Sequence, residues 1–266
     1  MSAGAARRED GPAPIPGVTA ALVTLFRDDL SVDYEATAAL AGRLIEEGVD
    51  GVLVAGTTGE GRWLDARERV TLCAAVRRAV GDRAPVVAGV FGASGTEAAG
   101  EVEAALGAGA DGVVALSPEH EPAALFYRAL AEASGDAGFV LAYHLPSERP
   151  PGLRTDEVPG LAVAGVKDAS GDANRMARLV AGPAPPLYVG AALLGTARAA
   201  GCAGAILALA GLSPRLCLDV WEGDAERVPD LLALHVEASE AFPQGLKALL
   251  AARHGTSCVT RWSAAG

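Results

Sequence analysis

The chain has 266 residues, half of them apolar and 21% charged, a composition that suits a globular protein with a sizeable core. Its formal net charge of −11 disfavours nucleic acids and anionic membranes as partners, because both are negatively charged. No stretch approaches the ~20 apolar residues of a membrane span, and the N-terminus lacks the apolar core of a signal peptide. We therefore expect a disordered tail over residues 1–16 and a cytoplasmic protein.

After Pro16, short β-branched apolar runs alternate with longer segments of helical period, a pattern typical of parallel βα units. The pattern predicts strands at residues 18–26, 50–54, 85–90, 111–116, 138–143, 163–167, 186–190 and 204–209. It predicts helices between them at about residues 33–47, 65–80, 95–108, 122–134, 155–160, 172–181 and 192–200. Several of these helices end at a glycine, which favours the left-handed conformation that often closes a helix.

The number of strands favours a closed (β/α)8 barrel, or TIM barrel, over residues 17–212. An open sheet would need two edge strands with polar protection, and none is evident. Residues 213–266 contain Pro214, Pro229 and Pro243 near expected helix starts. We therefore predict a C-terminal extension with two or three helices. No linker separates it from the barrel, so it is expected to pack there as part of the same domain.

Cysteine and histidine usage indicates neither a disulfide framework nor a metal site. The four cysteines show no C-x-x-C spacing and are expected to be reduced core residues. The four histidines are scattered, and no His, Asp and Glu spacing resembles a set of ligands. We expect no metal and no cofactor.

Lys167 follows the apolar run AVAGV, at the end of a predicted strand, where the catalytic groups of such a barrel stand. The chain contains two lysines and twenty arginines. A lysine can become a neutral amine and add to a carbonyl group, and burial favours this by lowering its pKa. The alternative is an ion pair with Asp168 or another acid at the barrel rim. The other lysine, Lys247, lies in a helical run and is expected to be solvated or to pack against its neighbours.

Two further groups of polar residues follow predicted strands. The segment GTTGEG (56–61) offers Thr57 and Thr58 between glycines, where hydroxyl and backbone N–H groups could hold a carboxylate. The alternative is an ordinary βα turn with a helix-capping threonine. Tyr143 would place its hydroxyl over the barrel mouth, unless it is a structural tyrosine.

Together, ALVTLF (21–26), GTTGEG (56–61), YHLP (143–146) and GVKDASG (165–171) resemble the dihydrodipicolinate synthase and N-acetylneuraminate lyase family over residues 17–255. The resemblance implies that Lys167 forms an imine with a 2-oxo acid such as pyruvate, that Thr57 and Thr58 hold its carboxylate, and that Tyr143 relays protons. It also implies a homo-oligomer, a dimer or a tetramer. The other expected substrate contacts are Gly56, Gly190, Ile206, His120 and His144.

The sequence departs from the synthase branch of this family in the groups around the second substrate. Glu119 and His120 occupy the loop where that branch has a tyrosine, and His144 replaces an asparagine. Glu148 stands at the position of an arginine that binds the carboxylate of the second substrate, and Arg149 comes one residue too late. The proton relay and the substrate are therefore expected to differ.

The sequence thus predicts a class I lyase or aldolase that acts on pyruvate or a related 2-oxo acid, with an aldehyde acceptor that it leaves open. One alternative is 4-hydroxy-tetrahydrodipicolinate synthase, which condenses pyruvate with aspartate semialdehyde. Another is a catalytically silent paralogue that binds a 2-oxo acid as a ligand. A phosphate- or flavin-binding barrel is disfavoured, because residues 189–195 and 207–213 resemble a glycine-rich phosphate cradle only faintly.

Overall fold

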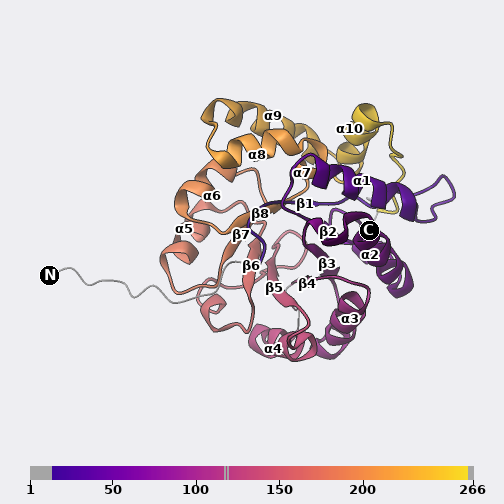
Figure 1. Ribbon diagram of the computed structural model, residues 1–266. Helices are drawn as coiled ribbons and strands as arrows, with labels where there is room; N and C mark the ends of the chain where they lie inside the picture. The colour runs from indigo at the N-terminus through magenta and orange to yellow at the C-terminus, as the bar shows by residue number, and fades with distance from the viewer. Residues whose placement is uncertain (1–13, 117, 119, 263–266) are drawn as a thin grey trace.

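The structure, a computed structural model, describes residues 14–116, 118 and 120–262. Its strands form one closed barrel in which each strand is hydrogen-bonded to its neighbours in chain order and all pairs are parallel (Figure 1). The strands are β1 (Gly17–Ala21), β2 (Gly51–Val54), β3 (Val86–Val90), β4 (Gly112–Leu116), β5 (Phe139–His144), β6 (Gly165–Asp168), β7 (Leu187–Val189) and β8 (Gly204–Leu207). The prediction of an eight-stranded parallel barrel is confirmed.

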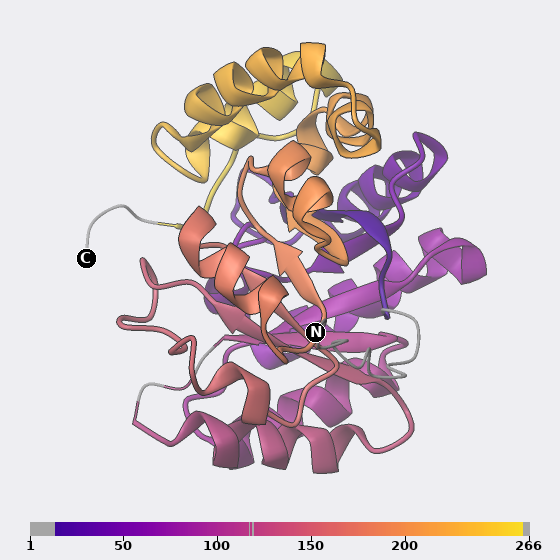
Figure 2. The same ribbon diagram turned by 90° about the vertical axis from the view of Figure 1, so that its left-hand side faces the viewer.

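Helices surround the barrel, and α8, α9 and α10 gather along one side of it (Figures 1 and 2). The helices are α1 (Tyr34–Glu46), α2 (Ala66–Val80), α3 (Gly95–Gly107), α4 (Ala123–Ser134), α5 (Ala173–Ala181), α6 (Leu194–Ala200), α7 (Leu209–Leu212), α8 (Pro214–Glu222), α9 (Val228–Ser239) and α10 (Gln244–His254). Several begin at a side chain that accepts a hydrogen bond from the first turn, namely Asp33, Asp65, Ser94 and Asp172. Within the described residues, no helix has the length and apolar run that crossing a membrane requires.

Several predicted elements are shorter than expected, and three of them show why. Strand β1 stops at Ala21, and the buried run that follows makes only one isolated bridge, between Phe26 and Val32. Strand β8 stops at Leu207, because the chain turns directly into α7. The helix expected at 155–160 is a turn followed by a 3₁₀ helix, Val158–Gly160. An apolar run in the sequence does not distinguish a strand from a buried loop, and a short helical pattern does not distinguish a helix from a single turn.

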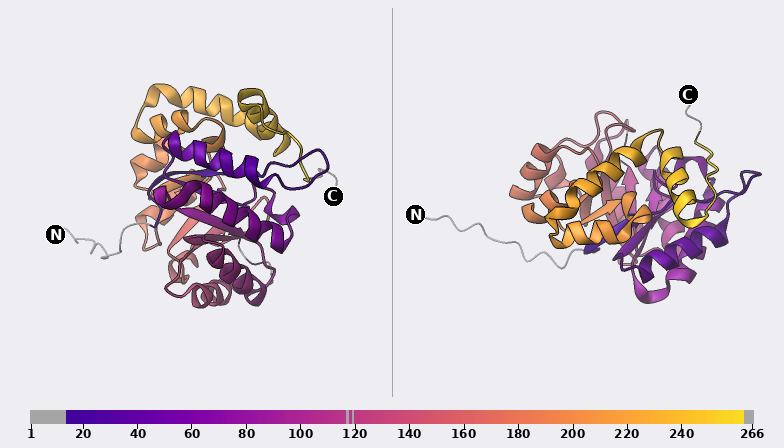
Figure 3. Two further views of the ribbon diagram at one scale, coloured as in Figure 1. Left: turned by 45° about the vertical axis from the view of Figure 1, so that its right-hand side comes forward. Right: turned by 90° about the horizontal axis from the view of Figure 1, so that it is seen from above.

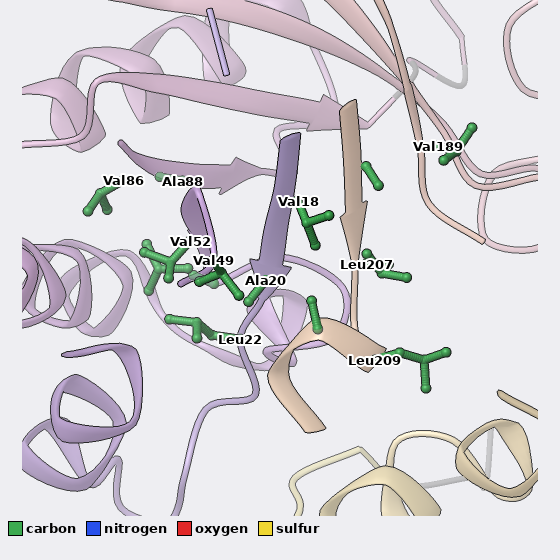
Figure 4. Packing of buried hydrophobic residues seen from close by; sticks show 14 of the residues in the cluster. Val18, Ala20, Leu22, Val49, Val52, Val86, Ala88, Val189, Leu207 and Leu209 are labelled. Atoms are coloured by element: carbon green, nitrogen blue, oxygen red, sulfur yellow. The ribbon is translucent and has the colours of Figure 1, made fainter. Parts of the chain in front are cut away.

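Side chains along each strand point alternately outward and inward, which divides the buried core into an outer and an inner layer. Outward side chains such as Val18, Ala20 and Val52 pack under the helices (Figure 4). Inward side chains, among them Leu53, Val87 and Leu141, fill the barrel. Successive residues of a strand therefore face opposite surroundings, which decides the side on which each polar residue at a strand end stands.

The described chain begins to pack before the first strand. Ile15 is fully buried, and its N–H donates to the hydroxyl of Tyr188 at 3.3 Å inside the barrel. Residues 1–13 of the tail expected at 1–16 lie outside the described part of the chain. In its described part, residues 213–262, the C-terminal extension contains the helices α8, α9 and α10, and its last described residues return to the barrel beside α2 (Figure 3).

Candidate active site

A cavity of about 230 Å³ opens at the carboxyl ends of the strands. Its inner wall contains Thr57, Tyr143, Lys167, Gly190 and Ile206, which come from five different strands or the loops after them. Thr58 also lines it. The structure thus brings six of the nine predicted site residues together.

Lys167 extends inward from β6, and its side chain is buried. Burial lowers the pKa of Lys167 to about 7, because the apolar interior penalises the ammonium form. Among the described residues, no carboxylate pairs with it. Asp168 faces outward on the same strand, and its Oδ2 accepts from Arg175 Nε at 2.7 Å. The alternative of an ion pair between Lys167 and Asp168 is therefore wrong, and a substantial fraction of Lys167 is a neutral amine near pH 7.

Tyr143 lies beside Lys167 on the adjacent strand. The two residues are partners in the β5–β6 ladder, and Lys167 Nζ lies 4.1 Å from the centre of the tyrosine ring. Burial raises the pKa of Tyr143 far above its ordinary value, and the charge of Glu148 adds to this rise. The hydroxyl therefore stays protonated at neutral pH. It is suited to donate a hydrogen bond or a proton rather than to act as a phenolate base.

The Gly56–Gly61 turn is held tightly at the mouth of the barrel. The carbonyl of Gly56 accepts from the N–H groups of Gly59 and Gly61, both at 3.0 Å, and Thr24 Oγ1 donates to the carbonyl of Gly59 at 2.6 Å. Glu60 adopts a left-handed conformation with φ of 53°, which is strained for a residue with a side chain. A turn fixed in this way presents Thr57 and Thr58 to the cavity in one position.

The Thr57 hydroxyl oxygen is buried and has no partner in good hydrogen-bond geometry among the described residues. Thr57 comes close enough to Tyr143 to oppose part of the rise in the tyrosine pKa. A hydroxyl in a cavity wall is free to hydrogen-bond to a polar group that enters the cavity. A carboxylate oxygen of a substrate would be such a group.

Three predicted contacts lie away from this cavity. His144 follows Tyr143 and so faces outward, where its Nδ1 accepts from the N–H of Leu153 at 3.0 Å. Burial lowers the pKa of His144, which favours the neutral ring. His120 is exposed, and Gly56 supplies its carbonyl to the turn rather than a surface to the cavity. Glu119, which together with His120 was expected at the mouth, lies outside the described residues.

The structure adds residues that the sequence did not predict as site residues. The outer wall of the cavity includes Ser147, His235, Ser239 and Phe242. His235 and Ser239 come from α9, and their side chains lie 3.5 Å apart. No motif marks them, because a helix far along the chain meets the barrel mouth only through tertiary packing. Glu148, which the sequence singled out, lies in the same wall.

Comparisons with known proteins agree with this geometry. The model of the dihydrodipicolinate synthetase family matches residues 14–231. An uncharacterized DapA-like lyase of Halobacterium salinarum is 34% identical over 249 residues, which cover 88% of this chain and 81% of the relative. A 4-hydroxy-tetrahydrodipicolinate synthase of Synechococcus is 36% identical over 190 residues, or 67% of this chain and 63% of the relative.

A solved structure gives the same result for the fold. The 4-hydroxy-tetrahydrodipicolinate synthase of Methylacidiphilum fumariolicum SolV is 25% identical, with a TM-score of 0.83. The match covers 94% of this chain and 90% of that protein.

The lowered pKa of Lys167 predicts a pH-dependent stability difference between the parent and Lys167→Met. The unfolded chain keeps this proton up to about pH 10.5, whereas the folded chain loses it near pH 7. Between these values the unfolded state binds the extra proton, so rising pH favours the folded state by about 1.4 kcal/mol per pH unit. The free energy of unfolding of the parent, measured in urea, should rise relative to that of the variant between about pH 7.5 and 10. Parallel curves would contradict a neutral lysine.

Proposed function

Since the chain belongs to the dihydrodipicolinate synthetase family and is a lyase, we propose that it forms a Schiff base between Lys167 and pyruvate or a related 2-oxo acid. One observation carries the proposal. Lys167 is a buried amine with a pKa near 7, in a cavity with no described carboxylate partner. Such an amine is a nucleophile, and a carbonyl compound is the substrate class that it attacks.

The chemistry that we propose uses the neutral amine directly. The Nζ lone pair adds to C2 of the 2-oxo acid, and the carbonyl π pair moves to the oxygen. That oxygen leaves as water with the two protons that the amine gives up, and the imine remains. Tyr143 stays protonated at neutral pH, so its hydroxyl can pass protons to and from the departing oxygen.

The carboxylate of the 2-oxo acid would lie against the Thr57–Thr58 turn. Thr57 offers a hydroxyl without a satisfied hydrogen bond, and Thr58 lines the same wall. Gly190 borders the same cavity, and it packs so closely against Ala169 that a Cβ at this position would lie 2.6 Å from the Ala169 Cβ. The carbonyl carbon would then face Lys167, and the rest of the substrate would point to the cavity mouth.

At the mouth, the acceptor half of the substrate would meet Ser147, Glu148, His235 and Ser239. The carboxylate of Glu148 repels another carboxylate, whereas the hydroxyl and imidazole groups suit hydroxyls or a cation. We propose an acceptor aldehyde that is neutral, hydroxylated or cationic. We also propose that the protein is a homo-oligomer, a dimer or a tetramer, as the family resemblance implies.

A second candidate function is that of 4-hydroxy-tetrahydrodipicolinate synthase, which several curated relatives carry as their name. A third, a silent paralogue that binds a 2-oxo acid, is opposed by the presence of Lys167 and Tyr143 side by side in one cavity with Thr57 and Thr58. A protein that only binds its ligand has no need of a lysine with a depressed pKa.

Borohydride reduction in the presence of pyruvate tests the nucleophile. One reduced three-carbon adduct per chain is expected, on the peptide that contains Lys167, because borohydride reduces the imine to a stable secondary amine. Lys167→Arg keeps a positive charge but cannot form the imine, so it should show no adduct and no turnover. Intact mass and peptide mapping read the result. An adduct on Lys247, or none with any of a panel of 2-oxo acids, would refute the mechanism.

Tyr143→Phe removes only a hydroxyl and tests the proton relay. Turnover should fall about 10²- to 10⁴-fold, because general acid–base catalysis contributes rate factors of this size. Trapping of pyruvate on Lys167 should persist, since the nucleophile is intact. Steady-state kinetics and the borohydride assay should be carried out on the same preparation. Turnover within a few-fold of the parent would make Tyr143 a structural residue.

Glu148 predicts the charge of the acceptor. With aspartate semialdehyde, kcat/KM should stay below ~10⁴ M⁻¹s⁻¹, the lower end of the range for enzymes acting on their own substrates. Glu148→Gln should raise that value, because it removes a negative charge that faces the acceptor's carboxylate. The exposed Glu222, at the end of α8, gives a matched control as Glu222→Gln. Efficient condensation by the parent would instead establish the synthase function.

A further inference from the structure

Lys247, the second lysine, holds a buried carboxylate at the edge of the candidate site. Its side chain is fully buried, so the solvated alternative is wrong, and the packing alternative holds because Nζ lies 4.4 Å from the centre of the Phe26 ring. Nζ also donates to Glu60 Oε1 at 2.5 Å and to the carbonyl of Val259 at 2.7 Å. The ion pair joins α10 to the Gly56–Gly61 turn.

The other donors to Glu60 come from the end of the chain. Oε2 of Glu60 accepts from Thr260 Oγ1 at 2.7 Å, from the N–H of Arg261 at 2.7 Å and from the N–H of Trp262 at 2.6 Å. Glu60 is itself fully buried. A buried carboxylate is tolerated only when it is paired and hydrogen-bonded, so its position depends on these four donors. We call residues 259–262 the C-terminal clasp.

The clasp is fixed from outside as well. The ring of Trp262 stacks on that of Trp63, with centres 4.7 Å apart and planes at 15°. Arg261 donates to both carboxylate oxygens of Glu68 on α2 at 2.7 Å, and to the carbonyl of Trp63 at 3.0 Å. Together with the Lys247–Glu60 ion pair, these contacts link α10, the Gly56–Gly61 turn and α2 through the clasp.

Glu60 is coupled to the residues that face the cavity. It follows Thr58 by two positions, and its N–H donates to the carbonyl of Thr57 at 3.1 Å. Its backbone is strained, with φ of 53°, and such a conformation persists only when surrounding contacts hold it. On the other side, Leu246 lines the cavity directly before Lys247 in α10.

We propose that the C-terminal clasp, acting through Lys247 and Glu60, positions the Thr57–Thr58 turn to bind the carboxylate of the substrate. Glu60 and Lys247 are positioning residues that touch no substrate. The inference rests on the proposed function, because it requires a 2-oxo acid whose carboxylate lies against that turn. Loss of the clasp should therefore weaken binding of the 2-oxo acid and leave the nucleophile itself intact.

Glu60→Gln gives the sharpest test. All four partners of the carboxylate are donors, so the amide N–H₂ group of glutamine must face at least one of them and displace the turn. The pyruvate concentration that half-saturates borohydride trapping should rise about tenfold or more, the effect of losing a hydrogen bond to a charged group. The trapping rate at saturating pyruvate should stay within about threefold of the parent, because the hydrogen bonds of the Glu60 carboxylate involve neither Lys167 nor Tyr143.

A second substitution provides rescue. Lys247→Met added to Glu60→Gln removes a donor that the glutamine amide would face, so the double variant should recover part of the lost pyruvate affinity. A purely structural role would predict the opposite, with the two losses adding. Arg215→Gln, which removes the exposed partner of the ion pair with Asp219 on α8, is the matched control and should change neither quantity.

The outcomes separate the two proposals. If the parent traps no 2-oxo acid, the proposed function fails and the inference fails with it. If the parent traps pyruvate and folded Glu60→Gln reaches half-saturation of trapping at the same pyruvate concentration, the inference alone is overturned. It is also overturned if the variant lowers only the trapping rate at saturating pyruvate. Should Glu60→Gln not fold, Trp262→Ala removes the ring stack at the partly exposed edge of the clasp. It is expected to raise the half-saturating concentration in the same direction, and no rise would overturn the inference.

Discussion

An ammonium group costs several kcal/mol to hold away from water unless a carboxylate or several hydrogen bonds compensate. Lys167 has no such compensation among the described residues beyond the face of the Tyr143 ring, and its pKa falls to about 7. Burying this group lowers the stability of the folded barrel. The two layers of buried apolar side chains around it offset that loss. A residue held at a cost to stability and placed in a cavity is the pattern expected of a reactive group.

Because side chains alternate between the two faces of a strand, the position of a polar residue on its strand decides whether it faces the cavity with Lys167. Tyr143 and Lys167 face inward on neighbouring strands, so the next residues, His144 and Asp168, face outward as a second ladder pair. Asp168 there binds Arg175, whose Nη1 donates to Thr155 Oγ1 at 2.8 Å. This outer network ties β6 and α5 to the loop before β6. A step of one residue along these strands therefore separates the side chains that face the cavity from those that form the hydrogen-bond network outside the barrel.

The fold could be predicted from the sequence because alternation of apolar runs and helical periods is a local signal that eight βα units repeat. The residues of the inner cavity wall could be predicted because Thr57, Tyr143 and Lys167 each stand at or just after the end of a predicted strand. The outward direction of His144 could also be predicted from its place directly after Tyr143. The motif YHLP (143–146) instead led to the expectation that both residues contact the substrate. His235 and the partners of Glu60 could not be predicted, since their neighbours are far away in the sequence and no spacing encodes them.

The two lysines show how environment separates roles that residue type leaves open. Both are buried, and burial lowers the pKa of both. For Lys247 the Glu60 carboxylate opposes this fall and supplies a hydrogen bond, so the charged form is stabilised and the amine is held in an ion pair. Lys167 has no carboxylate of this kind among the described residues, and its amine remains available. The Gly56–Gly61 turn lies between these two environments, with Thr57 on the cavity side and Glu60 on the clasp side. A change in the ion pair therefore reaches the cavity through the backbone of one short turn.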